Sequence, residues 1–385
     1  MAEARFRVEI PDADVLDLKA RLRGVRLADD FANADWRFGV ERGWLADMLA
    51  YWADDYDWRA EEAAINRLPH HRIELDGIPI HYIRAEGKGP HPLPVVLTHG
   101  WPWTFWDWHD LIGPLSDPAA HGGDPADAFD VIVPSLPGFG FSTPLRTADV
   151  GVREIAALWV RLMERLGHNR FMAAGGDWGS LVSAELGHAH PAQVAGVHLT
   201  LPILPGVDRD TVQPSDFDAS EGWMHERNRE ARPVSDGHIL AHRRSAQTLA
   251  YAFTDSPAGL AAWIWERRRN WSDCGGNVER VFSRDFLCTT ASLYWFTRTI
   301  GTAMRLYASH GPERWTPLHD RERVIDVPTA FAVAPRELFL LPRRVAERKT
   351  NLVRWTTLPE GGHFLPSETP WRLIDEYRAF ARTLR

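Results

Sequence analysis

The chain has 385 residues, of which 44% are hydrophobic and 25% are charged, a composition typical of a globular protein with a large core. Its formal net charge of −8 argues against nucleic acid as a partner, because no basic excess is available to neutralise a row of phosphates. Two cysteines, Cys274 and Cys288, cannot form a disulfide framework, and no long apolar run predicts a membrane span.

The N-terminal seventy residues predict helices. The first residues are charged and lack the apolar segment of a signal peptide, so we expect a cytoplasmic protein with no membrane partner. Pro11-Asp12 favours the start of one helix, and a second helical pattern covers about 42–56. Two alternating runs, 71–75 and 78–83, then flank Asp76-Gly77, a pair typical of a hairpin turn.

Beyond the hairpin, strands alternate with helices. Short apolar runs predict buried strands, at 94–98, 129–133, 170–174, 193–200, 327–333 and 352–357. Helical patterns cover 151–166, most of 206–324, and 369–384. This alternation predicts an α/β fold with a mostly parallel central sheet and helices on both faces. A helical cap inserted after a core strand would lie above the carboxyl ends of the strands, where ligands bind.

The clearest motif is Gly175-Gly-Asp-Trp-Gly179, which directly follows a predicted strand and opens a helix. This is the pattern of a nucleophile elbow, a strained turn that exposes its central side chain above the sheet, with Asp177 in place of the usual serine. An aspartate side chain, with an ordinary pKa of about 3.9, is ionised at neutral pH and needs no base to attack. Attack on an alkyl centre gives an ester, so a base is needed only to activate water in the second step.

The remaining catalytic groups are expected at fixed positions in this fold. The base should be a late histidine, and His363 follows the last predicted strand. The acid that orients it should follow the preceding strand, where Glu337 lies. The backbone N–H groups of Trp101 and Trp178 are expected to form an oxyanion hole.

Each of these residues also has a structural explanation when it is taken alone. Asp177 in a glycine-rich turn is typical of a helix cap, and His363 between glycines and a phenylalanine is typical of a loop. The presence of Asp177, Glu337 and His363 in the order and positions of a triad favours the catalytic interpretation.

Four segments together resemble the epoxide hydrolases of the microsomal type and their soluble bacterial relatives: His99-Gly-Trp-Pro102, Gly175-Gly-Asp-Trp-Gly-Ser180, Leu249–Leu260 and Pro359–Phe364. The resemblance covers nearly the whole chain. It implies an α/β-hydrolase fold that opens an epoxide to a vicinal diol, with Asp177 as nucleophile, His363 as base and Glu337 as its orienting acid. It also implies four regions: an N-terminal arm at 1–70 that wraps the core, the core at 71–205 and 325–385, and the cap at 206–324.

In this family, cap tyrosines donate hydrogen bonds to the epoxide oxygen. The resemblance assigns this role to Tyr307, although a packed cap tyrosine is the alternative. At the position of the second tyrosine the chain has His238 instead. Either His238 supplies a ring N–H to the substrate, or Tyr307 acts alone, or a neighbouring residue compensates.

The segment after the oxyanion turn also departs from the family, because aromatic residues replace the usual small ones from Trp103 to Trp108. We expect His99, Pro102 and Trp103 to contact substrate, and an aromatic wall would favour a flat, aromatic or unsaturated epoxide. In its length and departures the chain resembles soluble actinobacterial members of natural-product pathways, including those of enediyne antibiotics.

Two other functions remain open at this point. A haloalkane dehalogenase also uses an aspartate followed by tryptophan, and Trp178 could bind the halide, but the N-terminal arm and Tyr307 argue against it. A non-catalytic binding protein of this fold would typically lose a triad member. The sequence predicts no metal, nucleotide or flavin site, and a homodimer is the commonest assembly for such a protein.

Overall fold

The computed structural model describes residues 4–310 and 315–385. Within them, one nine-stranded sheet has the order β1-β2-β3-β5-β4-β6-β7-β8-β9. The pairs among β1, β2, β3 and β5 are antiparallel, and all later pairs are parallel. The strands are β1 Ala4–Arg5, β2 His70–Leu75, β3 Ile78–Ala85, β4 Leu93–Thr98, β5 Phe129–Pro134, β6 Phe171–Gly175, β7 Val194–Leu199, β8 Ile325–Val333 and β9 Thr350–Thr357.

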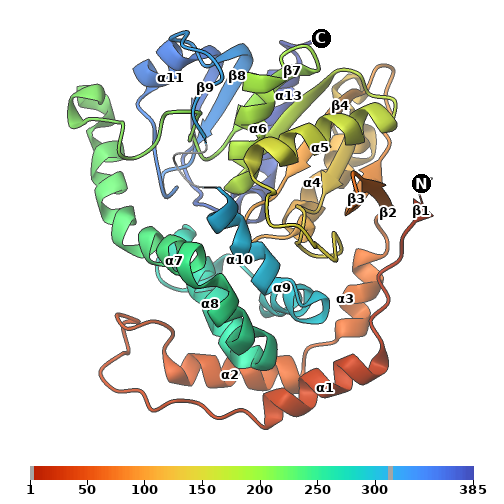
Figure 1. The fold of residues 1–385 in the computed structure, drawn as a ribbon, viewed down its shortest axis with the longest axis vertical. Helices are drawn as coiled ribbons and strands as arrows, with labels where there is room; N and C mark the ends of the chain where they lie inside the picture. Colours follow the sequence, from red (N-terminus) through yellow and green to blue (C-terminus); the bar gives the residue numbers. More distant parts are fainter. Residues whose placement is uncertain (1–3, 311–314) are drawn as a thin grey trace.

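Helices cover the sheet and form a layer beside it (Figure 1). Helices α5 and α6 pack together on one face, and α4 and α13 pack together on the other. The helices are α1 Asp12–Arg23, α2 Arg42–Asp54, α3 Trp58–Ile65, α4 His109–Ser116, α5 Val152–Arg165, α6 Trp178–Ala189, α7 Gly222–Asp255, α8 Pro257–Trp271, α9 Arg284–Thr297, α10 Ile300–Ser309, α11 Arg343–Lys349, α12 Leu365–Glu368 and α13 Pro370–Ala381. None of the helices in the described part of the chain combines the length and apolarity needed to cross a membrane.

The central strands β4 and β6 determine where the site lies. Val95, Val96 and Leu97 of β4 are completely buried, as a strand covered on both faces requires. In the parallel pairing of β4 with β6, Thr98 lies opposite Gly175. Both strands therefore end at the same edge of the sheet, and the turns that follow them are neighbours.

The helices α7 to α10, called the cap below, lie between β7 and β8 in sequence. The helices α1 to α3, called the arm below, lie between β1 and β2 in sequence and contact this cap, since α1 packs on α8 and α2 packs on α9 (Figure 1). Indole N–H groups make part of this contact: Trp44 donates to Glu279 at 2.8 Å and Trp52 donates to Ser292 at 2.9 Å. The arm thus supports the cap from the side away from the sheet.

Candidate active site

Asp177 occupies a tight turn between β6 and α6. Its φ of 52° and ψ of −127° are strained for a residue with a side chain. The flanking glycines are required by space: a Cβ at Gly179 would lie 1.8 Å from the Thr98 carbonyl oxygen, and one at Gly175 would lie 2.4 Å from the backbone of Gly179. The turn therefore has the nucleophile-elbow geometry predicted from its sequence.

The turn after β4 faces the Asp177 carboxylate. The backbone N–H of Trp101 donates to Asp177 Oδ1 at 2.8 Å, and a Cβ at Gly100 would lie 2.2 Å from the same oxygen. Trp178 is the first residue of α6, where backbone N–H groups have no acceptor within the helix. Both N–H groups named from the sequence thus lie beside Asp177, and that of Trp101 is hydrogen-bonded to its carboxylate.

His363 lies between two carboxylates. Its Nε2 is 3.3 Å from Asp177 Oδ2, and its Nδ1 is 2.6 Å from Glu337 Oε1. The loops after β8 and β9 approach through a bridge between Arg336 and Gly362, which brings Glu337 to the histidine. Burial opposes a charge on His363, but the Glu337 and Asp177 carboxylates outweigh it and raise the pKa of the imidazole to about 10.

Two cap side chains meet above Asp177. The Tyr307 hydroxyl of α10 lies 3.2 Å from His238 Nε2 of α7. Burial, reinforced by the Asp177 carboxylate, raises the pKa of Tyr307 well above 10, so the phenol is neutral. Burial lowers the pKa of His238 well below 6.5, so its imidazole is also neutral. A proton donor and a group that can either donate or accept are therefore in contact at this point.

A cavity of about 410 Å³ reaches these groups. Asp177, Tyr307 and His238 line its inner end, and charged residues such as Arg243 lie at its rim. Its walls are mainly apolar, formed by Trp178, Leu181, Leu201, Ile203, Leu204, Val207, Ile239, Leu240, Trp315 and Leu338. Within the described ranges, no three His, Cys, Asp or Glu side chains are grouped as metal ligands would be.

The structure gives no support to the expected substrate contacts of His99, Pro102 and Trp103, since none of the three lines this cavity. Trp103 is completely buried, with its ring 5.6 Å from His363 and 5.7 Å from Phe364. Trp106 and Trp108 are buried as well, so the aromatic segment is core packing behind the site.

The contacts of His99 indicate a structural role. Its Nδ1 donates to the Gly100 carbonyl at 2.9 Å, and its Nε2 accepts the Leu136 N–H at 3.1 Å. Because the carbonyl can only accept and the amide can only donate, these partners fix one neutral tautomer. Burial lowers the pKa of His99 to about 4, which keeps this arrangement neutral and holds the oxyanion turn.

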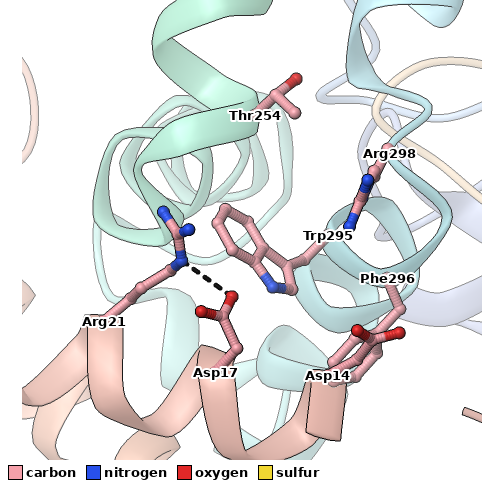
Figure 2. Close-up of a pocket in the computed structure, with 7 residues that line it drawn as sticks. All are labelled: Asp14, Asp17, Arg21, Thr254, Trp295, Phe296 and Arg298. Carbon is pink, nitrogen blue, oxygen red and sulfur yellow. Dashed lines mark hydrogen bonds and ion pairs between the residues drawn. The ribbon is translucent and has the colours of Figure 1, made fainter. Parts of the chain in front are cut away.

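A smaller cavity of about 230 Å³ lies between the arm and the cap (Figure 2). Asp17 and Arg21 of α1 form an ion pair of 2.8 Å at its edge, opposite Trp295. This cavity shares no lining residue with the one that reaches Asp177. Of the groups named from the sequence, Asp177, Trp178, His238 and Tyr307 line the larger cavity, and none lines the smaller one.

Glu368 lies near the site, but no sequence pattern singled it out. Its side chain is half-buried, and its carboxylate accepts the N–H of Phe364 at 2.8 Å and the N–H of Asp273 at 2.7 Å. Burial raises the pKa of Glu368 to about 7. No motif marks this residue, because its partners are backbone groups of a loop and of a distant cap segment.

Comparison with known proteins identifies the fold and its arm. Residues 3–108 match the family described as epoxide hydrolase N terminus, and residues 94–274 match the α/β-hydrolase fold. A protein of Stigmatella aurantiaca is 38% identical over 99% of this chain and 85% of its own length, and it is named as an epoxide hydrolase. Epoxide hydrolase 1 of Oryctolagus cuniculus is 31% identical over 95% of this chain and 85% of its own length.

A solved structure agrees with this. The epoxide hydrolase of Aspergillus niger superposes with a TM-score of 0.88 at 28% identity, covering 100% of this chain and 97% of that one. These comparisons confirm the α/β-hydrolase fold and the family expected from the sequence.

Proposed function

This chain belongs to the epoxide hydrolase family of α/β-hydrolases, and we propose that it hydrolyses epoxides through a covalent ester on Asp177. One observation carries this mechanism. The elbow carboxylate is hydrogen-bonded to an oxyanion N–H through Oδ1 and lies beside the imidazole of His363 through Oδ2. A carboxylate in this position can attack, and the same surroundings can then hydrolyse the ester it forms.

In the first step, Oδ2 of Asp177 attacks an epoxide carbon and the carbon–oxygen bond of the ring breaks. The electron pair goes to the ring oxygen, which takes the proton of the Tyr307 phenol. Because that phenol is neutral and lines the cavity with Asp177, it is available as the acid. The product is an alkyl ester with a new hydroxyl on the adjacent carbon.

In the second step, water attacks the carbonyl carbon of the ester. Ester formation removes the negative charge of Asp177, so the imidazolium of His363 can release a proton, which returns to the Tyr307 oxygen through water in the cavity. Neutral His363 then takes a proton from the attacking water, while Glu337 stabilises the new imidazolium. The negative oxygen that forms is Oδ1, which the Trp101 N–H already faces, with the Trp178 N–H as the second donor. Cleavage of the ester bond gives the diol, which takes the remaining proton.

His238 supports the ring-opening acid in this scheme. With its proton on Nε2, it donates to the Tyr307 oxygen and leaves the phenol proton free for the epoxide. His238 also lines the cavity, and in place of the second tyrosine of the family it therefore acts on the epoxide through Tyr307.

The apolar walls favour an apolar epoxide. The aromatic groups that line the cavity are Trp178, Trp315 and Tyr307, and these, rather than Trp103, support the proposal of an aromatic or unsaturated substrate. A role in secondary metabolism, a cytoplasmic location and a homodimer stay predictions from the sequence.

Single turnover in ¹⁸O-labelled water tests the mechanism. Excess purified enzyme is mixed with styrene oxide, and the diol and the peptide containing Asp177 are analysed by mass spectrometry. The expected result is label in Asp177 and none in the first-turnover diol. Label in the diol alone would mean direct attack by water and would contradict the ester. Asp177→Asn is the control, expected to give neither diol nor labelled peptide.

A further inference from the structure

A fully buried ion pair lies behind the active site. Arg268, on α8 of the cap, and Asp107, in the turn after β4, both have completely enclosed side chains. They meet in two hydrogen bonds, Nη1 to Oδ1 at 2.7 Å and Nη2 to Oδ2 at 3.0 Å. Such bidentate pairs fix orientation as well as distance. Removing two charges from water cancels much of the attraction between them, so a buried ion pair is weak evidence for added stability. The other contacts of Arg268 and Asp107 indicate the role of the pair.

One side of this pair holds the oxyanion turn. Nη2 of Arg268 faces the Pro102 carbonyl oxygen at 3.4 Å, and Oδ2 of Asp107 accepts the N–H of Thr104 at 2.9 Å. Pro102 directly follows Trp101, whose N–H faces Asp177. The pair therefore limits where that N–H can point.

The other side holds the loop of the catalytic base. The guanidinium carbon of Arg268 lies 4.0 Å from the centre of the Phe364 ring, and the Ser367 hydroxyl donates to Asp107 Oδ1 at 2.7 Å. Phe364 directly follows His363, and Ser367 lies one helical turn further on. The oxyanion donor and the base, which are 262 positions apart in the chain, are thus tied to the same two side chains.

On the basis of the ester mechanism, we propose that Arg268 is a positioning residue for ester hydrolysis. In that step the Trp101 N–H and His363 must act together on one tetrahedral centre. In ring opening, by contrast, His363 takes no proton. A displacement of about 1 Å can cost about 100-fold in rate, so loosening the pair slows hydrolysis more than alkylation.

The test separates the two steps in the full-length enzyme. Arg268→Lys keeps the charge but loses the bidentate contact and the ring stacking. The control is Arg267→Lys, because Arg267 is also buried, pairs with Glu266 at 2.6 Å and stacks on Trp263 at 3.5 Å, all within α8. Rapid mixing with styrene oxide, followed by intact-protein mass spectrometry, gives the rate constants of ester formation and ester loss.

We expect Arg268→Lys to slow ester loss by about 10-fold or more, with a much smaller effect on ester formation, and Arg267→Lys to change neither. The ester would then accumulate in the steady state only in the Arg268 variant, a signature that a loss of stability alone cannot produce. A lower melting temperature with an unchanged rate of ester loss would overturn the proposal.

Ser367→Ala is the second variant, since it removes only the bond from the histidine loop to Asp107 and leaves the ion pair intact. We expect it to slow ester loss by a smaller factor. If Arg268→Lys does not fold, an unchanged rate of ester loss in Ser367→Ala overturns the proposal. Absence of any ester in the unaltered enzyme would contradict the Asp177 mechanism itself, and with it this inference.

Discussion

Nε2 of His363 lies 3.3 Å from Oδ2 of Asp177, so the charge on the proposed nucleophile controls the proton on the proposed base. While Asp177 is an anion, its carboxylate and that of Glu337 hold the imidazole protonated, with a pKa of about 10. Once Asp177 is an ester, that support is removed and His363 can act as a base. In the proposed mechanism, ester formation therefore prepares His363 for ester hydrolysis.

Replacing His363 by Gln should separate the two steps. The side chain of Gln can still donate a hydrogen bond to Asp177 but cannot take a proton from water. We expect ester formation to persist and ester hydrolysis to fall by about 10²–10⁴-fold. Intact-mass spectrometry after mixing with styrene oxide should show protein carrying one substrate molecule that decays slowly. An enzyme that forms no adduct would show that His363 is needed for ring opening as well.

The rate of ester hydrolysis should rise with pH. The imidazolium must lose its proton before it can accept one from water, and in the ester its pKa lies below the resting value of about 10 because the Asp177 charge is absent. Glu337→Gln removes the strongest of the groups that raise this pKa, so the inflection should move to lower pH. Ester decay after a pH jump measures it. An inflection at the same pH in both proteins would exclude Glu337 as the partner that sets this titration.

Tyr307→Phe should impair the other step. Without the phenol proton the developing alkoxide has lost its main acid, so ester formation should slow by about 10²–10⁴-fold while hydrolysis of any ester formed changes little. Tyr251→Phe is the matched control, because Tyr251 is also in the cap but is 71% exposed. His238→Phe should slow ring opening by a smaller factor. The pre-steady-state burst of ester formation measures these effects. An unchanged burst in Tyr307→Phe would show that Tyr307 contributes to packing only.

The elbow glycines allow a stability test. Gly179→Ala puts a Cβ 1.8 Å from the Thr98 carbonyl oxygen, so the turn and β4 must move apart, at a cost of about 3 kcal/mol or more. Gly237→Ala in α7 meets nothing within 4 Å and should stabilise the protein by about 0.5–1 kcal/mol. Urea unfolding compares the two. If Gly179→Ala and the unaltered protein had equal free energies of unfolding, the turn would accommodate the added methyl group.

A chain of buried histidines predicts acid sensitivity. His70 donates to the Ile65 carbonyl at 2.8 Å and accepts from His81 at 2.8 Å, which in turn accepts from the Ser135 hydroxyl at 2.9 Å. This arrangement requires both rings to be neutral, and burial lowers the pKa of each below 6.5. Below about pH 6.5 the unfolded chain binds protons that the folded protein cannot, so stability should fall with falling pH.

The slope of unfolding free energy against pH, from about pH 7.5 to about pH 5, measures this effect. His81→Gln should reduce the slope, and His91→Gln, at an exposed position, should leave it unchanged. A slope that is the same in all three proteins would mean that other groups cause the loss.

Much of the fold was predictable because its signals are local. Asp76-Gly77 required a hairpin, and both residues have the positive φ values that such a turn needs, 51° and 77°. The predicted helix at 151–166 is α5, Val152–Arg165, and the predicted strand at 129–133 is β5, Phe129–Pro134. Periodicity and turn chemistry act between neighbours in sequence, so they are visible without a structure.

The expected contacts of His99, Pro102 and Trp103 find no support in the structure, for a related reason. Sequence places these residues next to the oxyanion turn but does not show which way their side chains point. In the structure Trp103 fills the space beneath Gly176, where a Cβ would lie 2.3 Å from its ring. The walls of the cavity come instead from the 201–207 segment and from α7, which carry no motif.

The sequence by itself determined the fold, the elbow and the order of the triad, because each depends on residue types at short or topologically fixed spacings. The tertiary structure decided which groups meet across the cap. The contact of His238 with Tyr307, the pair of Arg268 with Asp107 and the shape of the cavity all depend on how α7, α8 and α10 pack on the core. Packing joins residues tens to hundreds of positions apart through shape and burial, and no spacing in the sequence records these contacts.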